Sequence, residues 1–303
     1  MTDTRAPKRT AQETRGLWLG LLGVAIFAMT LPMTRLAVGA GGAAQLPGEF
    51  VAMGRAVVAG LLSLAFLVVT RAQLPKRTDL APLAWTCGGV VLGFPLFTSL
   101  AMRQVEAVHA SVIIGLLPMA TAVMGAWLNR QRPSFGFWLC AALGSALVVA
   151  FALWRAGGVS LQAADLLLLA AVVCAAVGYG HGGRLSQRLR AEHVICWALV
   201  LALPLTLPMA WWARPQAAAS ITAWAAFGYV AVFSMWIGFF AWYRGLALGG
   251  TVRVSQVQLV QPFLSMLFAV PLLGERLDVV TLGFSMAVIA TVFAGRKMQV
   301  RSS

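Results

Sequence analysis

The chain has 303 residues, of which 60% are apolar and 11% are charged. Soluble domains have about 25% charged and 45–50% apolar residues, so this composition excludes an ordinary soluble globular protein. The mean hydropathy of +0.84 indicates a polytopic membrane protein whose surroundings are the lipid bilayer. The net charge of +14 does not indicate a nucleic-acid partner, because the basic residues are dispersed between apolar stretches and form no single face.

Ten apolar stretches, each long enough to cross a bilayer, follow one another along the chain. Lipid requires closed backbone hydrogen bonding, and none of the stretches alternates with a period of two, so each is predicted to be a helix. The predicted spans are 16–39, 47–70, 82–102, 107–128, 135–154, 161–183, 191–212, 220–243, 253–274 and 278–295.

The basic residues predict the orientation of these spans. With the amino terminus in the cytoplasm, the cytoplasmic segments hold 17 Lys and Arg and the opposite connections hold 4. Arg35 and Arg55 lie inside spans, which accounts for all 23 basic residues. Cytoplasmic connections carry an excess of Lys and Arg, so we expect both termini in the cytoplasm and the protein in a bacterial inner membrane.

An internal repeat relates the two halves of the chain. Three residues recur at one spacing of 144 positions: Ser111, Pro118 and Arg132 are followed by Ser255, Pro262 and Arg276. Because five is odd, a second group of five helices enters the membrane from the opposite side. The sequence therefore predicts an all-α membrane protein of ten helices arranged as two inverted five-helix repeats, an architecture of alternating-access transporters. The expected divisions are a basic tail 1–15, repeats 16–154 and 161–295, and a tail 296–303.

Several motifs resemble those of a known family. They are Gln261-Pro262 with Leu272-Leu273-Gly274-Glu275-Arg276-Leu277 after it, Gly54-Arg55 in the second span, and Pro118 before Arg132-Pro133-Ser134. This pattern resembles the EamA family of the drug/metabolite transporter superfamily, close to its aromatic amino-acid exporters. The resemblance implies two inverted repeats and transport, often export, of small metabolites such as amino acids. Gln131 departs from the acidic residue that the first repeat usually has there, so the two copies differ in ion pairing.

No carboxylate lies in the middle of a predicted span, since all nine acids are at span ends or in connections. This argues against a proton-driven exporter of cationic drugs that depends on an embedded Glu. The histidines His109, His181 and His193 are separated by at least twelve residues and have no helical partner of the kind that a zinc site needs. We therefore expect no catalytic residue, no metal and no cofactor.

The remaining polar and aromatic groups inside the spans are candidates for substrate binding. Ser255, Gln258 and Pro262 share a helical face in the ninth span, beside Gln261. A buried amide either binds substrate or joins helices together, and both interpretations stay open. The aromatic rings inside the spans indicate either an apolar binding pocket or ordinary packing between helices. The other substrate-binding candidates are Phe94, Phe97, His109, Ser111, Tyr179, His181, Trp236, Phe240 and Tyr243.

A second group of residues concerns helix breaks and gating. Pro118 and Pro262 each remove a backbone donor, which either exposes a carbonyl at a binding site or only kinks the helix. Arg55 either binds a substrate carboxylate or serves the structure, and the family resemblance favours the structural role. Glu275 and Arg276 are interpreted as a structural or gating element that ends the ninth span.

These observations favour a transporter that exports small amphipathic metabolites or facilitates their passage, in particular aromatic or apolar amino acids. Alternating access about a midplane site is the expected mechanism, without an embedded carboxylate as a proton site. Other cargo, such as a drug, nucleobase or sugar, is an alternative, and a membrane enzyme or structural subunit is a further one. The oligomeric state does not follow from the sequence.

Overall fold

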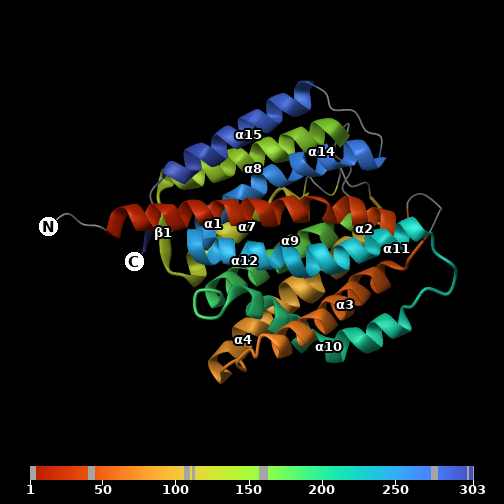
Figure 1. Ribbon diagram of the computed structural model, residues 1–303. Coiled ribbons are helices and arrows are strands. Elements are labelled where there is room, and N and C mark those ends of the chain that lie inside the picture. Colours follow the sequence, from red (N-terminus) through yellow and green to blue (C-terminus); the bar gives the residue numbers. More distant parts are fainter. Residues whose placement is uncertain are drawn as a thin grey trace.

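The computed structural model describes residues 5–39, 45–105, 110, 113–156, 163–273, 279–298 and 300–302. Most of these residues lie in helices that run lengthwise through an elongated bundle (Figure 1). In chain order the helices are α1 (Arg5–Ala28), α2 (Thr30–Val38), α3 (Gly48–Val69), α4 (Arg77–Thr86), α5 (Phe94–Ala101), α7 (Leu117–Leu128), α8 (Phe135–Ala156), α9 (Ala163–Leu185), α10 (Ala191–Trp212), α11 (Ile221–Tyr229), α12 (Gly238–Gly249), α13 (Thr251–Ser255), α14 (Gln261–Leu273) and α15 (Val279–Lys297).

Helices are present within all ten predicted spans. Among the described residues, six helical segments are long and apolar enough to cross a membrane, and the count of ten crossings stays a prediction. The six are Ala11–Val38, Gly48–Val69, Arg77–Ala101, Ala164–Leu185, Ala191–Trp212 and Ile221–Gly249.

Irregular stretches interrupt several of these segments. Two are π-helices, Cys87–Gly93 before α5 and Val230–Ile237 before α12, and their starts are 143 residues apart. A 3₁₀ stretch, Gln256–Val260, joins α13 to α14. π-Helices are rare and are frequent at functional sites. The recurrence of one at the same place in each half is therefore a second sign of the internal repeat.

Proline explains the break in the first segment. Pro32 has no N–H to donate to the carbonyl of Ala28, four residues earlier, and α1 ends at Ala28. The free Ala28 carbonyl instead accepts a hydrogen bond from Ser265 Oγ of α14 at 2.5 Å. A polar side chain of the second half thus satisfies the broken helix of the first half.

Helices at equivalent positions in the two halves make equivalent packing contacts. α3 packs against α10, and α8 packs against α15. α1 packs against α12, and its counterpart α9 packs against α4 and α5. Figure 1 shows α8 and α15 side by side along one flank of the bundle. This pattern is what a two-fold relation between halves would produce, while the inversion itself stays a prediction.

Glycine allows the close approach of α1 and α12. A Cβ atom added at Gly245 would lie 2.7 Å from the backbone nitrogen of Gly20, and one added at Gly23 would lie 3.0 Å from Cβ of Trp242. Small residues let membrane helices pack backbone to backbone. The glycines of the first helix therefore serve packing inside the chain. Gly250, with φ of +80°, makes the turn from α12 to α13, where a side chain would be strained.

A two-stranded antiparallel sheet lies at one end of the bundle. Strand β1 (Gln131–Pro133) pairs with β2 (Val300–Ser302), with Arg132 opposite Arg301. The start of α1 lies at this same end, which we call the sheet end (Figure 1). These strands were not predicted from the sequence, because each is only three residues long and lies in a polar connection.

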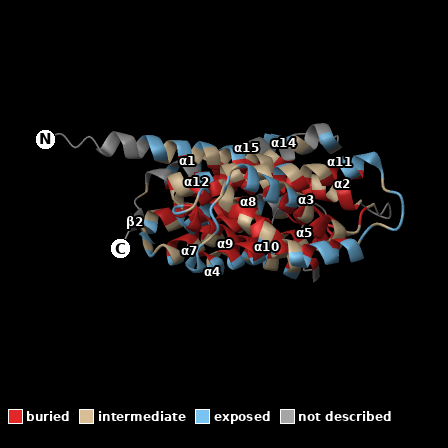
Figure 2. Ribbon diagram, turned by 60° about the horizontal axis from the view of Figure 1, so that its bottom comes forward, coloured by how far each residue is buried: buried red, intermediate tan, exposed pale blue. Residues whose placement is uncertain are grey.

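Many large apolar side chains are exposed on the outside of the helical bundle. Val69, Leu166 and Trp211 are exposed by 81%, 70% and 71%. Figure 2 shows the complementary interior, where buried residues follow the centre of the bundle and exposed residues line its outside. Many large apolar side chains on the outside of a helical bundle are typical of a protein embedded in lipid.

Candidate functional site

Two small neighbouring cavities lie between the halves of the chain. They share Leu31, Ile114, Leu117 and Gln261, and we call them together the central cavity. The cavity that includes Arg55 has a volume of about 20 Å³, and the cavity that includes Gln258 has a volume of about 10 Å³. Each volume is close to that of one water molecule, so the structure is a closed conformation. The other lining residues are Phe27, Thr30, Arg55, Val90, Phe94, Tyr179, Ser234 and Phe239 in the larger cavity, and Pro118, Gln258, Pro262 and Ser265 in the smaller one.

Both halves contribute equivalent positions to the central cavity. Four pairs of lining residues are separated by 144 positions, the spacing of the sequence repeat: Val90 and Ser234, Ile114 and Gln258, Leu117 and Gln261, and Pro118 and Pro262. In three of these pairs the first half supplies an aliphatic side chain and the second half a polar one. The cavity is therefore symmetric in position but not in chemistry.

Arg55 carries the positive charge of the cavity. It is the eighth residue of α3, about two turns from the helix start, and its side chain is only 2% exposed. Its Nε and Nη1 atoms have no hydrogen-bond partner. None of the described lining residues is an Asp or a Glu. The guanidinium charge therefore has no counter-charge within the cavity wall.

Hydroxyl groups connect the halves across the cavity. Thr30 Oγ1 and Ser234 Oγ share a hydrogen bond of 2.8 Å. Thr30 begins α2 after the break in the first segment, and Ser234 lies in the second π-helix. The irregular backbone at both places brings these side chains into the cavity wall. This hydrogen bond joins the two halves in the closed conformation.

The ninth segment supplies the predicted amides. Gln258 is buried, and its Nε2 and Oε1 atoms have no hydrogen-bond partner. Gln258, Gln261 and Pro262 line the same cavity. Ser255 is buried as well, but its hydroxyl donates to the Val252 carbonyl at 2.8 Å, and it is not among the cavity-lining residues described. An unsatisfied buried amide costs free energy, which a ligand can recover by hydrogen bonding to it.

The aromatic candidates of the eighth segment lie in a different environment. Trp236 and Phe240 contact one another and contact Phe66 of α3, with ring centroids 5.2 to 6.0 Å apart. Phe66 also contacts His193 of α10 at 6.3 Å. We call these four residues the aromatic cluster, and none of them lines the central cavity.

The other candidates are distributed over several elements. Tyr243 packs against Phe239, and its hydroxyl donates to the Gly178 carbonyl at 3.1 Å. His181 stacks on Trp85, whose side chain is 59% exposed. Phe94 and Tyr179 line the central cavity, whereas Phe97 lies on α5 outside the lining set. His109, Ser111, Glu275 and Arg276 lie outside the described residues.

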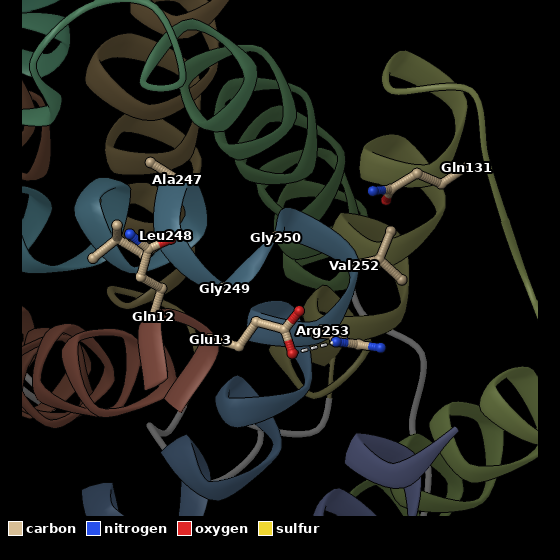
Figure 3. A pocket seen from close by; sticks show the side chains of 9 residues that line it. All are labelled: Gln12, Glu13, Gln131, Ala247, Leu248, Gly249, Gly250, Val252 and Arg253. Atoms are coloured by element: carbon tan, nitrogen blue, oxygen red, sulfur yellow. Dashed lines mark hydrogen bonds and ion pairs between the residues drawn. The ribbon is translucent and has the colours of Figure 1, made fainter. Parts of the chain in front are cut away.

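A larger pocket opens at the sheet end. It has a volume of about 540 Å³ and lies between α1, α12, α13 and β1 (Figure 3). Glu13 Oε2 accepts a hydrogen bond from Arg253 Nη1 at 2.8 Å, so the charges of these two side chains compensate each other. We call it the end pocket, and its lining residues are Gln12, Glu13, Gln131, Ala247, Leu248, Gly249, Gly250, Val252 and Arg253.

Several residues of the central cavity were not among the candidates predicted from the sequence. Thr30 and Ser234 are single hydroxyls within apolar runs, and such residues are common in membrane helices. Phe27 and Phe239, whose rings are 5.0 Å apart, were equally inconspicuous among many aromatic residues. One usable signal was the repeat spacing itself, since Val90 and Ser234 are related by 144 positions.

Comparisons with known proteins agree with this architecture. The model of the EamA-like transporter family matches residues 14–153 and again residues 162–294. The chain is 44% identical over 288 residues to "Uncharacterized transporter YdeK" of Bacillus subtilis (strain 168), covering 94% of this chain and 98% of that one.

A solved structure titled "Crystal structure of protein" has the same fold. Its TM-score is 0.74, and the match covers 93% of this chain and 97% of that chain at 18% identity. This likeness shows the fold alone. The two family matches together span most of the chain, and the relative named a transporter matches nearly its whole length. The chain therefore belongs to the EamA-like transporter family, within the drug/metabolite transporter superfamily.

Proposed function

We propose that this transporter exports amino acids with aromatic or other apolar side chains, or facilitates their passage, and binds them in the central cavity. The observation that carries this proposal is the combination of two polar side chains with a wall of rings and aliphatic side chains. Arg55 Nε and Nη1 and both amide atoms of Gln258 have no hydrogen-bond partner. The polar atoms of an amphipathic solute would bind Arg55 and Gln258, and its apolar surface would pack against the rings and aliphatic side chains.

The small size of the cavity supports alternating access. Ligand sites for small molecules have volumes of about 300–1,000 Å³, far larger than the closed cavity. An amino acid therefore enters only when the halves move apart. The Thr30–Ser234 hydrogen bond and the Ser265–Ala28 hydrogen bond join the halves in this conformation, and both must break or lengthen for that movement.

The lining residues support transport without a proton site in the membrane. None of the described lining residues is acidic, so transport follows the solute gradient and does not need an imposed proton gradient. Proteoliposomes with and without a pH difference test this point. Equal initial rates are expected, whereas uptake only in the presence of the gradient would contradict uncoupled transport.

The orientation is part of the proposal. We place both termini in the cytoplasm of a bacterial cell, with the protein in the inner membrane, because the cytoplasmic segments then hold 17 of the 23 basic residues. The sheet end, which holds the start of α1 and strand β2, would then face the cytoplasm. The end pocket would be a vestibule on that side.

The deciding experiment is uptake and efflux in proteoliposomes over a panel of amino acids, uracil, glucose and a cationic dye. Saturable flux of phenylalanine or leucine supports the proposal, and flux restricted to another solute class overturns the proposed cargo. Gln258→Ala should raise KM, while Gln256→Ala is the matched control because Gln256 is buried nearby but does not line the cavity.

Trp236 needs a variant that separates binding from packing. Trp236→Ala would leave a hole in the aromatic cluster and lower stability whatever the role of the ring. Trp236→Phe keeps an aromatic ring against Phe66 and removes the indole N–H. An unchanged KM in Trp236→Phe would assign Trp236 to packing, and a raised KM would assign it to the substrate site.

A further inference from the structure

We propose that Arg55 binds the carboxylate of the transported solute, and that this carboxylate is the group by which the carrier selects its substrates. The inference rests on the proposed function for the location of the solute in the central cavity. It goes further because it gives Arg55 a ligand-binding role and defines a class of solute by one chemical group.

The surroundings of Arg55 differ from those of other arginines in the structure. Arg35 donates from Nη1 to the Val105 carbonyl at 2.7 Å. Arg253, Arg244 and Arg188 form ion pairs with Glu13, Glu192 and Asp79 at 2.8, 2.9 and 3.3 Å. Arg55 is buried more deeply than these residues, yet its Nε and Nη1 atoms have no partner.

A structural role for Arg55 would require such a partner. Moving an isolated charge out of water is expensive, and buried charges in proteins are normally paired or hydrogen-bonded. The described residues around Arg55 supply no acid for pairing. If the partner is the ligand, the free-energy cost of burying the Arg55 charge favours binding, because the anionic group of the solute compensates the guanidinium while the solute is bound.

The charge and geometry of the cavity select a carboxylate. The described wall contains a single charged side chain, so one negative charge on the ligand neutralises it. A guanidinium presents a planar pair of N–H donors that fits the two oxygens of a carboxylate. Phe27, Phe94 and Phe239 line the same cavity and are suited to an apolar or aromatic remainder of the solute.

The second half of the chain supplies no equivalent cation. The residue 144 positions after Arg55 is Leu199, which is fully buried on α10, the helix that packs against α3. At the other related positions it is the second half that contributes Gln258, Gln261 and Ser234. The solute therefore binds in one orientation, with its carboxylate toward α3 and its other polar atoms toward the amides of the ninth segment.

The test measures binding to the purified full-length protein in detergent by calorimetric titration. The probes are L-phenylalanine, 3-phenylpropanoate, which lacks the amino group, and L-phenylalaninamide, which lacks the carboxylate. We expect both carboxylates to bind the wild type and the amide to bind at least tenfold more weakly. Arg55→Gln should lower the affinity for both carboxylates at least tenfold, because the carboxylate then loses its charged hydrogen-bond donors.

Two controls separate ligand binding from structural damage. Arg35→Gln makes the same substitution at an arginine that does not line the cavity, and it should keep the preference for carboxylates. The melting temperature of Arg55→Gln without ligand should equal or exceed that of the wild type, because the change removes an uncompensated buried charge. A clear fall in this temperature would indicate a structural role.

The outcomes distinguish this inference from the proposed function. Equal affinity for the amide and for phenylalanine, undiminished binding by Arg55→Gln, or no binding of either carboxylate to the wild type would overturn the role of Arg55. If carboxylates bind through Arg55 but no amino acid crosses the membrane, the inference stands and the proposed amino-acid transport fails. If amino acids cross at the same rate in Arg55→Gln, the transport proposal stands and this inference fails.

Discussion

The central cavity and the end pocket differ in volume and in charge: the larger pocket has compensated charges, and the smaller cavity does not. The end pocket has a volume of about 540 Å³, and its Glu13 and Arg253 side chains compensate each other's charge. The larger part of the central cavity has only about 20 Å³, and its Arg55 charge has no partner in the wall. A small volume in one conformation does not exclude a binding site, because the volume changes when helices move. A buried charge without a counter-charge costs free energy in the closed conformation, which a bound anion can offset. This difference favours the central cavity over the end pocket as the proposed ligand site.

The largest expected effect comes from Arg55→Gln. Without the guanidinium the solute carboxylate loses its charged partner, and we expect phenylalanine transport in proteoliposomes to fall about 10- to 100-fold. Arg253→Gln removes an arginine from the end pocket and serves as the comparison. A larger loss with Arg253→Gln than with Arg55→Gln would reverse the assignment of the two sites.

A steric change beside the end pocket should act on stability. Gly245 lies on α12 before the residues that line this pocket, and a side chain there would meet the backbone of Gly20. We expect Gly245→Leu to lower the free energy of unfolding by about 1–3 kcal/mol, because α1 and α12 cannot approach as closely. Thermal unfolding in detergent measures this change. Gly228→Leu is the control, since a Cβ atom at Gly228 meets no atom within 4 Å.

A moderate effect is expected from the amide of the central cavity. Gln258→Ala removes one neutral donor and one neutral acceptor, each contributing about 0.5–1.5 kcal/mol to a hydrogen bond. KM for phenylalanine should therefore rise by a factor of about three to ten, and Gln256→Ala should leave it unchanged. Identical KM values for the two variants would show that Gln258 only joins helices.

The smallest effect is expected at the ion pair of the end pocket. Glu13 lies near the start of α1, the helix that continues into the first half, and Arg253 lies on α13 in the second half, so Glu13→Gln weakens one connection between α1 and the second half. Partly exposed pairs contribute up to about 1 kcal/mol, and salt screens them. We expect a modest increase in maleimide labelling of Ala247→Cys at low salt, and a smaller increase at high salt.

A control for this ion pair lies inside the second half. Glu192→Gln breaks the pair with Arg244, which joins α10 to α12 without connecting the two halves. Labelling of Ala247→Cys should not change in this variant. An equal increase in both variants would indicate general loosening of the bundle and not opening between the halves.

The sequence predicted the helical segments because long apolar runs determine them directly. The prolines also indicated where backbone irregularity lies, as at Pro262 after the 3₁₀ stretch. The π-helices were not predicted, since they differ from α-helices only in local hydrogen bonding, which apolar runs do not reveal. The β1–β2 pairing was not predicted either, since it depends on contacts between segments distant in the chain. Periodicity along one helix contains no information about such contacts.

Part of the central cavity was accessible from sequence. Gln258, Gln261 and Phe94 were expected at a substrate site because of their polarity or aromaticity within the spans, and the structure places them in the cavity wall. Trp236 was favoured for the same reason but lies in the aromatic cluster. Which residues of a helix face the other half is decided by packing, and a single sequence does not reveal it.

The most direct test is an experimental structure of the full-length protein with bound L-phenylalanine. We expect the amino acid in an enlarged central cavity, with its carboxylate within hydrogen-bonding distance of the Arg55 guanidinium and its ring among Phe27, Phe94 and Phe239. Phenylalanine bound in the end pocket beside Arg253, with the central cavity still closed around an unpartnered Arg55, would contradict this expectation.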